Sequence, residues 1–125
     1  MAGGQPVRGE PLWPSGAAHD NWLGRYRAGK IARRVADGLR HELPGLLVDD
    51  RPEVIDGVWT LRVAVPAEIV AEELVSGTVA ENVPWLADGE PGRVRVPFGL
   101  GYSAEEQEQL LLVAAKVIHY LRATG

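Results

Sequence analysis

The sequence predicts a small α/β domain of the α+β type, in which a mostly antiparallel sheet carries helices on one face. The 125 residues, of which 46% are hydrophobic, fit a single domain with a modest core. Apolar residues recur at four-residue spacing in residues 31–39, which indicates a helix. A capping-box pattern at residues 103–106 indicates the start of another, and short runs rich in β-branched residues between the two indicate strands. The expected order is therefore helix, strand, strand, helix, strand, strand, helix.

The first helix is predicted over residues 20–42. Asp20 can cap its N-terminus, and Pro44 with Gly45 follows its end. Arginine and lysine side chains supply its polar surface. Its apolar stripe is formed by Ile31, Val35 and Leu39. This pattern is typical of an amphipathic helix that packs one face against a core.

Four segments are predicted as strands. The strongest candidate is Val58–Val65, because it is rich in β-branched and aromatic residues. The other candidates are the runs at residues 46–48, 78–83 and 93–98. Residues 49–52 are predicted as a polar turn, and residues 84–92 as a loop.

Two further helices complete the predicted domain. One covers residues 67–75 and is ended by Ser76–Gly77. The last begins at Ser103 and Glu106, which have the spacing of a capping box, and runs to about Arg122.

Residues 1–18 are predicted to form a flexible arm, because they contain four glycines and three prolines. Residues 19–125 then form one small α/β domain. The first residues lack the apolar core of a signal peptide, and no apolar run approaches the roughly 18 residues that a membrane span needs. We therefore expect a cytoplasmic protein with no membrane partner.

The net charge of −4 is divided unevenly along the chain. Residues 1–45 hold seven basic and four acidic side chains, whereas residues 46–125 hold six and thirteen. A basic first helix can meet phosphates or an acidic partner, and the alternative is a solvated helix face. The acidic total and the lack of interleaved aromatic residues argue against nucleic acid as a partner.

Residues that could carry covalent or metal chemistry are sparse. The chain has no cysteine, which excludes thiolate catalysis, disulfides and zinc–thiolate sites. Its three histidines lie far apart, so no metal site is expected. Lys30 and Lys116 lie in predicted helices, and neither follows a strand in a Ser- or Gly-rich loop. Neither lysine is therefore assigned a covalent role.

The predicted strand at residues 93–98 carries the candidate binding site. Arg93 and Arg95 alternate with Val94 and Val96, so the two arginines should share one face of the sheet. Two guanidinium groups could bind a carboxylate or a phosphate through paired hydrogen bonds. The alternative is a pair of arginines that face solvent on a half-covered sheet.

The last predicted helix contains the unbroken apolar run Leu110–Ala115. Six consecutive residues point in every direction around a helix, so one sheet cannot bury all of them. We expect Leu112 to face another chain, either in a homo-oligomer or in a complex.

Arg33–Leu39, followed by Leu43–Leu46, resembles a segment of fold-type I pyridoxal-phosphate enzymes in which a long helix leads through a Leu-Pro-Gly turn into the small C-terminal domain. Val58–Val65 resembles the first main strand of that domain. Gly92–Val96 resembles the strand whose arginine binds the substrate α-carboxylate. The crossing and terminal helices of the family are resembled by residues 67–77 and 103–121. The match covers about residues 22–122 and fits both the aminotransferases and the threonine-aldolase or β-eliminating-lyase group.

The resemblance implies a function that this chain could not perform alone. In the family, the cofactor lysine, the aspartate at the pyridine nitrogen and the phosphate-binding loop belong to a large domain, for which 125 residues leave no room. The implied protein is a small subunit, or split C-terminal half, that completes an aminotransferase or lyase acting on an amino acid. Arg95, with Arg93 in reserve, would bind the substrate carboxylate. A separately encoded large-domain subunit would hold most of the pyridoxal phosphate site.

A second function stays open on the residues themselves. The chain could be a non-catalytic α/β module that binds a small anion or a protein, or that mediates oligomerisation.

Overall fold

A computed structural model of the protein describes residues 11–14 and 17–124. It confirms the predicted α+β fold and the predicted order of elements. The helices are α1 (Trp22–Glu42), α2 (Ala71–Ala80) and α3 (Ala104–Thr124). The strands are β1 (Leu47–Ile55), β2 (Val58–Ala64), β3 (Leu86–Ala87) and β4 (Arg93–Phe98).

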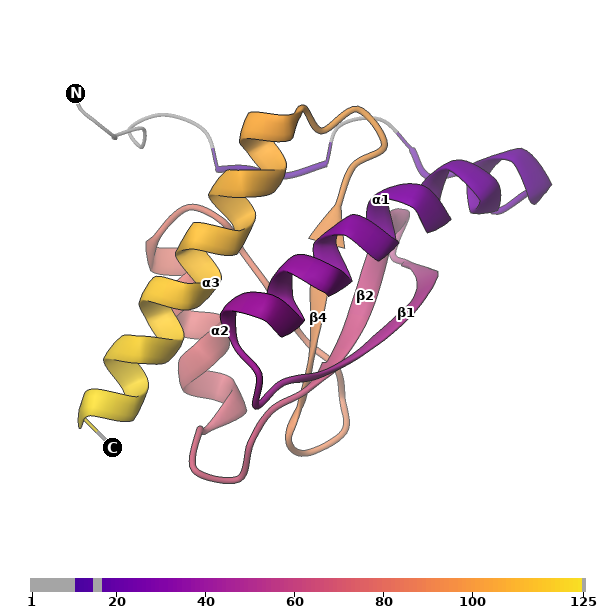
Figure 1. The fold of residues 1–125 in the computed structure, drawn as a ribbon. Coiled ribbons are helices and arrows are strands. Elements are labelled where there is room, and N and C mark those ends of the chain that lie inside the picture. Colours follow the sequence, from indigo (N-terminus) through magenta and orange to yellow (C-terminus); the bar gives the residue numbers. More distant parts are fainter. Residues whose placement is uncertain (1–10, 15–16, 125) are drawn as a thin grey trace.

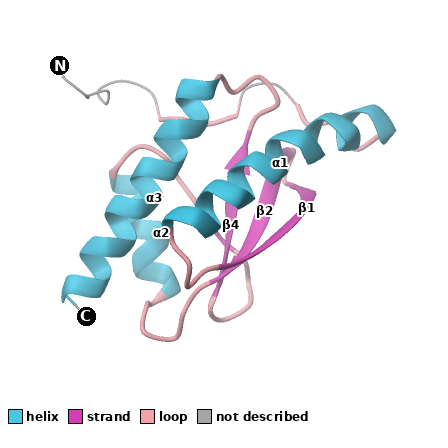
Figure 2. Cartoon of the chain, viewed as in Figure 1, coloured by secondary structure: helices cyan, strands magenta, loops and turns pink. Residues whose placement is uncertain are grey.

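The strands form one antiparallel sheet in the order β1-β2-β4-β3, and the helices lie on one of its faces (Figures 1 and 2). Helix α1 lies across β1 and β2, α3 lies beside α1, and α2 lies beside α3 near β3 and β4. The opposite face of the sheet has no helix over it within the described residues.

The core lies between the helices and the sheet. Leu61, Val63, Val94 and Val96 project from β2 and β4 into it and are fully buried. Helix α1 contributes small and branched side chains, so it can approach the sheet closely. Its buried core residues are Ala28, Ala32, Val35, Ala36 and Leu39. The predicted stripe of α1 is thus confirmed at Val35 and Leu39, while Ile31 is half-buried.

Helices α1 and α3 each begin with a side-chain cap. The predicted capping box is confirmed, because Ser103 N donates to Glu106 Oε1 at 2.8 Å and Glu106 N donates to Ser103 Oγ at 3.1 Å. The predicted cap of the first helix was wrong by one residue. Asn21 Oδ1 accepts from Gly24 N at 2.8 Å, whereas Asp20 pairs with Arg25.

Strand β1 is longer than predicted, and the predicted turn at residues 49–52 lies within it. The register shifts between Asp49 and Glu53, so the polar residues between them are accommodated as an irregularity of the strand. Because β1 is an edge strand, Pro52 costs the sheet no central hydrogen bond.

The middle of the chain differs most from the prediction. Helix α2 begins at Ala71, continues through Gly77, where an end was predicted, and occupies part of the predicted strand at residues 78–83. Thr78 Oγ1 donates to Val75 O at 2.9 Å and accepts from Trp85 N at 3.0 Å, which connects α2 to the segment that follows it. Strand β3 then lies within the predicted loop at residues 84–92.

Part of the predicted arm lies against the domain. Leu12 N donates to Asn82 O at 2.7 Å, and Ala18 N donates to Gly57 O at 3.0 Å. Residues 1–10 and 15–16 of that arm lie outside the described residues, so its flexibility stays a prediction.

Two helical glycines are expected to respond in opposite ways to replacement by alanine. A Cβ at Gly77 would lie 2.5 Å from Val117 Cγ1, a stiff and buried side chain of α3. A Cβ at Gly29 would meet no atom within 4 Å. Gly29→Ala should raise the free energy of unfolding by about 0.5–1 kcal/mol. Gly77→Ala should lower it by about 1 kcal/mol, because overpacking costs more than helix propensity gains.

Urea unfolding of the two variants checks this contact. A stabilising effect of Gly77→Ala equal to that of Gly29→Ala would show that α2 and α3 are not packed tightly at this point.

Candidate functional site

The face of the sheet without helices carries a connected group of charges, here called the open-face cluster. It consists of Arg62, Arg93, Arg95, Glu53, Asp88 and Glu90. Arg62 of β2 lies directly opposite Arg95 of β4, and Ala64 lies opposite Arg93. The predicted placement of Arg93 and Arg95 on one face is therefore confirmed.

Arg95 lies at the centre of this cluster. Its Nε donates to Asp88 Oδ1 at 2.6 Å, and its Nη1 donates to Glu53 Oε1 at 2.5 Å. A weaker contact joins Nη1 to Thr60 Oγ1 at 3.4 Å. The side chain is only 11% exposed, which is low for an arginine on an uncovered sheet.

Asp88 is the buried partner that holds Arg95. It follows β3 directly, and its side chain is 1% exposed. Burial alone would raise its pKa, but the hydrogen bonds and charges of Arg95 and Arg62 outweigh burial and hold the pKa of Asp88 below its usual value. Its carboxyl group is therefore ionised at neutral pH.

Arg93, the second predicted site residue, serves a different carboxylate. Its Nη1 donates to Glu90 Oε1 at 2.6 Å, and the same oxygen accepts from Arg62 Nη2 at 3.2 Å. Arg93 is also much more exposed than Arg95. The two arginines share a face but do not converge on one partner within the described residues.

The chemistry open to this cluster is charge recognition. Burial alone would lower the pKa of Arg95, but Glu53 and Asp88 raise it, so the guanidinium is always protonated. Three arginines and three carboxylates balance, and a shallow hollow beside them is lined by Asp49, Arg62 and Arg93 among others. The guanidinium groups of the cluster have the geometry to bind and orient a carboxylate.

Asp88, Glu53 and Arg62 were not predicted as site residues. Asp88 and Glu90 were placed in a loop, and Glu53 was placed after a turn. One signal was available, because the acidic residues 88 and 90 directly precede the strand that carries the arginines. The pairing of Arg62 with Arg95 depends on strand register, which a single sequence does not show.

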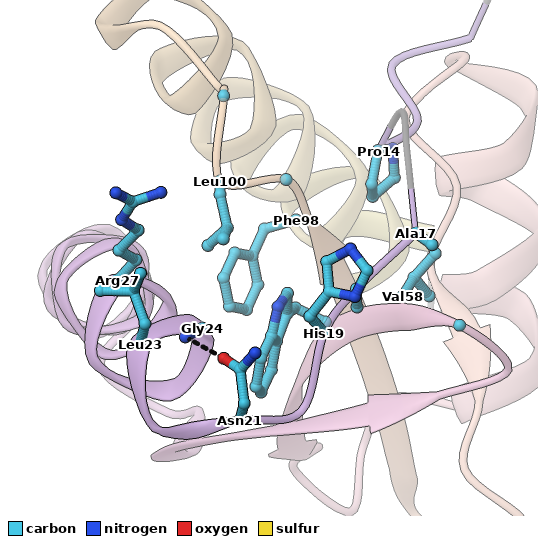
Figure 3. Close-up of a pocket in the computed structure, with 15 residues that line it drawn as sticks. Pro14, Ala17, His19, Asn21, Leu23, Gly24, Arg27, Val58, Phe98 and Leu100 are labelled. Atoms are coloured by element: carbon cyan, nitrogen blue, oxygen red, sulfur yellow. Dashed lines mark hydrogen bonds between the residues drawn. The ribbon is translucent and has the colours of Figure 1, made fainter.

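A separate hollow of about 220 Å³ lies where the start of α1 meets the β1–β2 turn and the loop after β4 (Figure 3). Figure 3 shows Phe98 in this hollow, with Arg27 on one side and His19 on the other. The indole Nε1 of Trp59, which also lines it, is buried without a hydrogen-bond partner among the described residues. Neither lysine lines this hollow.

The residues of this chain do not fit covalent binding of pyridoxal phosphate. Lys30 Nζ lies 4.9 Å from the centre of the Tyr26 ring, and both side chains are exposed on α1. Lys116 Nζ pairs with Glu81 Oε1 at 2.9 Å on the surface of α3. A Schiff-base lysine commonly lies in a desolvated pocket, whereas both lysines are exposed on their helices.

Within residues 11–14 and 17–124, no group of three or more His, Asp or Glu side chains is arranged to hold a metal ion. Within the same residues, no helix is long and apolar enough to cross a bilayer.

Comparison with known proteins finds a similarity of fold to solved structures. No family model matches the chain, and no curated protein matches it. The fold is similar to part of the crystal structure of a multiple substrate aminotransferase from Thermococcus profundus, with a TM-score of 0.52 and 15% sequence identity. The match covers 77% of this chain and 26% of the aminotransferase chain. This similarity shows a shared fold, and the present chain spans about a quarter of that enzyme.

The Asp88–Arg95 pair should be the main source of acid sensitivity in the cluster. A carboxyl group whose pKa is lower in the folded protein stabilises the fold fully above its unfolded pKa of about 4, and this contribution is lost as the pH falls through the folded pKa. Asp88→Asn should reduce the free energy of unfolding by about 1.5–3 kcal/mol at pH 7. It should also flatten the loss of stability below about pH 4, as measured by urea unfolding across pH.

Glu90→Gln is the matched control, because Glu90 is 58% exposed and its carboxylate pairs with Arg62 and Arg93 at the surface. It should cost no more than about 1 kcal/mol. Equal costs for the two variants would contradict the central role of the buried aspartate.

Proposed function

We propose that this chain is a small domain that completes a pyridoxal-phosphate-dependent enzyme acting on amino acids, of the aminotransferase or lyase type. The fold shared with part of an aminotransferase supports this proposal. So does the agreement between the structure and the order of elements that the sequence resemblance implies. Because the lysines of this chain do not fit the cofactor, a separate large-domain subunit would hold it.

Within that enzyme, Arg95 would bind the carboxylate of the amino-acid substrate. The observation that carries this assignment is the position of its guanidinium, which projects from β4, an inner strand of the sheet, and donates from Nε to the buried Asp88. A binding group held on a strand and oriented by a second buried group is more precise than one on a loop. Arg93, which is exposed and near the start of β4, would be a secondary contact.

This chain would orient the substrate and neutralise the charge of its carboxylate, and the cofactor on the partner subunit would supply the bond chemistry. A guanidinium binds a carboxylate through two parallel hydrogen bonds, which fixes the direction of the substrate as well as its position. Lysine could supply the charge but not this planar geometry.

A second candidate function is a non-catalytic module that binds a protein or a small anion. It is favoured by one observation, which is that each arginine of the open-face cluster already pairs with a carboxylate of the same chain. The two functions differ in whether a cofactor enzyme is formed when the chain meets its partner.

Isolation of the native complex tests the first function. The complex that contains this chain should show visible absorbance from bound pyridoxal phosphate, and borohydride should attach the cofactor to a lysine of the partner.

In the assembled enzyme, Arg95→Lys should lower turnover about ten- to a hundredfold, because a charge-assisted hydrogen bond is lost. Arg93→Lys is the control and should have a smaller effect.

A native complex without cofactor, or clean borohydride labelling of Lys30 or Lys116, would count against this function. Unchanged turnover for Arg95→Lys in an active complex would remove Arg95 from substrate binding and favour the module.

The partner is expected to cover the outer face of α3. Leu112 is 59% exposed, although Leu110 and Ala114 beside it are fully buried. Leu112→Glu should weaken association by at least the roughly 1.5–3 kcal/mol that burial of a leucine contributes, since a buried unpaired carboxylate costs more. Sedimentation measures the association, and circular dichroism should show an unchanged fold.

Val79→Glu on α2 is the control, because Val79 is similarly exposed but lies on another helix. If the wild-type chain sediments as a monomer both alone and in extracts of its cells, the predicted interface does not exist.

A further inference from the structure

We propose that Glu53 is a displaceable internal substitute for a ligand's carboxylate on Arg95, and that Asp88 is the permanent partner that positions Arg95 for the exchange. The ligand class is a small carboxylate. This inference rests on the proposed role of Arg95 in binding, but it requires neither the cofactor nor the partner subunit.

The two carboxylates that bind Arg95 differ sharply in exposure. The side chain of Asp88 is 1% exposed, whereas that of Glu53 is 57% exposed. A buried ion pair is costly to break because the remaining charge has no water to solvate it. A largely exposed carboxylate can return to water with a small loss. Glu53 is therefore the partner that a ligand can replace.

The hydrogen bonds on Arg95 leave one edge of the guanidinium for a ligand. Asp88 accepts from Nε, and Glu53 accepts from Nη1. Nη2 makes no hydrogen bond to any of the residues that the structure describes. If the Glu53 side chain moves away, Nη1 and Nη2 together present the two parallel donors that a carboxylate accepts most strongly.

The backbone around Glu53 allows its side chain to leave without disturbing the sheet. Glu53 lies on edge strand β1, next to the register shift that begins at Asp49. Its backbone carbonyl accepts from Thr60 Oγ1 at 3.0 Å, so the main chain is held independently of the carboxylate. Exchange of one carboxylate for another also leaves the charge next to Arg95 unchanged.

A titration of the full chain with acetate tests this proposal. The probe is the Nε–Hε signal of Arg95 in ¹⁵N-labelled protein, which Arg95→Lys identifies by its disappearance. Glu53→Gln should increase the affinity for acetate about two- to fivefold, which is the range expected when an exposed ion pair no longer competes. Glu68→Gln removes the same charge from a carboxylate that is 60% exposed and pairs with Arg122, outside the open-face cluster, so it should leave the affinity unchanged.

An equal increase in acetate affinity for Glu53→Gln and for the control variant would mean that net charge alone controls binding, and it would overturn the proposal. So would a missing response of the Arg95 signal to acetate in the wild type and in Glu53→Gln. Urea unfolding confirms that each variant is folded, and Glu53→Ala is a second variant that removes the same competing carboxylate. Failure to find a cofactor enzyme would leave the acetate result unaffected, so the two proposals fail separately.

Discussion

The pairing register of β2 with β4 determines which side of the sheet is core and which is charged. Val63 faces Val94 across this pair, and Arg62 faces Arg95. Because side chains alternate along a strand, a slip of one residue would place arginines beneath α1 and valines in water. The cost of burying those charges excludes that alternative, so the core and the open-face cluster are consequences of one register.

The carboxylates of the open-face cluster differ in burial, and the buried and the exposed ones have different roles. Asp88 is buried at a point where an unpaired carboxylate would be too costly, and Arg95 and Arg62 make its ionised form favourable there. Such a pair adds little net stability compared with apolar packing, but it fixes the direction of the guanidinium. Glu53 and Glu90, at the margin, balance the remaining charge while staying in contact with water.

The sequence was sufficient to predict the features that depend on local pattern. These were the fold class, the order of elements, the cap at Ser103 and the shared face of Arg93 and Arg95. It was insufficient where distant residues decide the outcome. Helix α2 passes Gly77 because this glycine leaves room for Val117, and Asp88 is buried because two strands place arginines beside it. Neither contact can be predicted from the short-range periodicity of the sequence.

The two free edges of the sheet limit how copies of this chain can associate. An exposed edge strand with unpaired backbone groups invites a strand from another molecule, which leads to continuous aggregation. Here β1 carries charged residues, an irregular register and Pro52, while β3 is only two residues long. Neither edge offers a long regular template, so growth by strand addition is disfavoured. Any specific assembly must therefore use side-chain surfaces, which can select one partner and then stop.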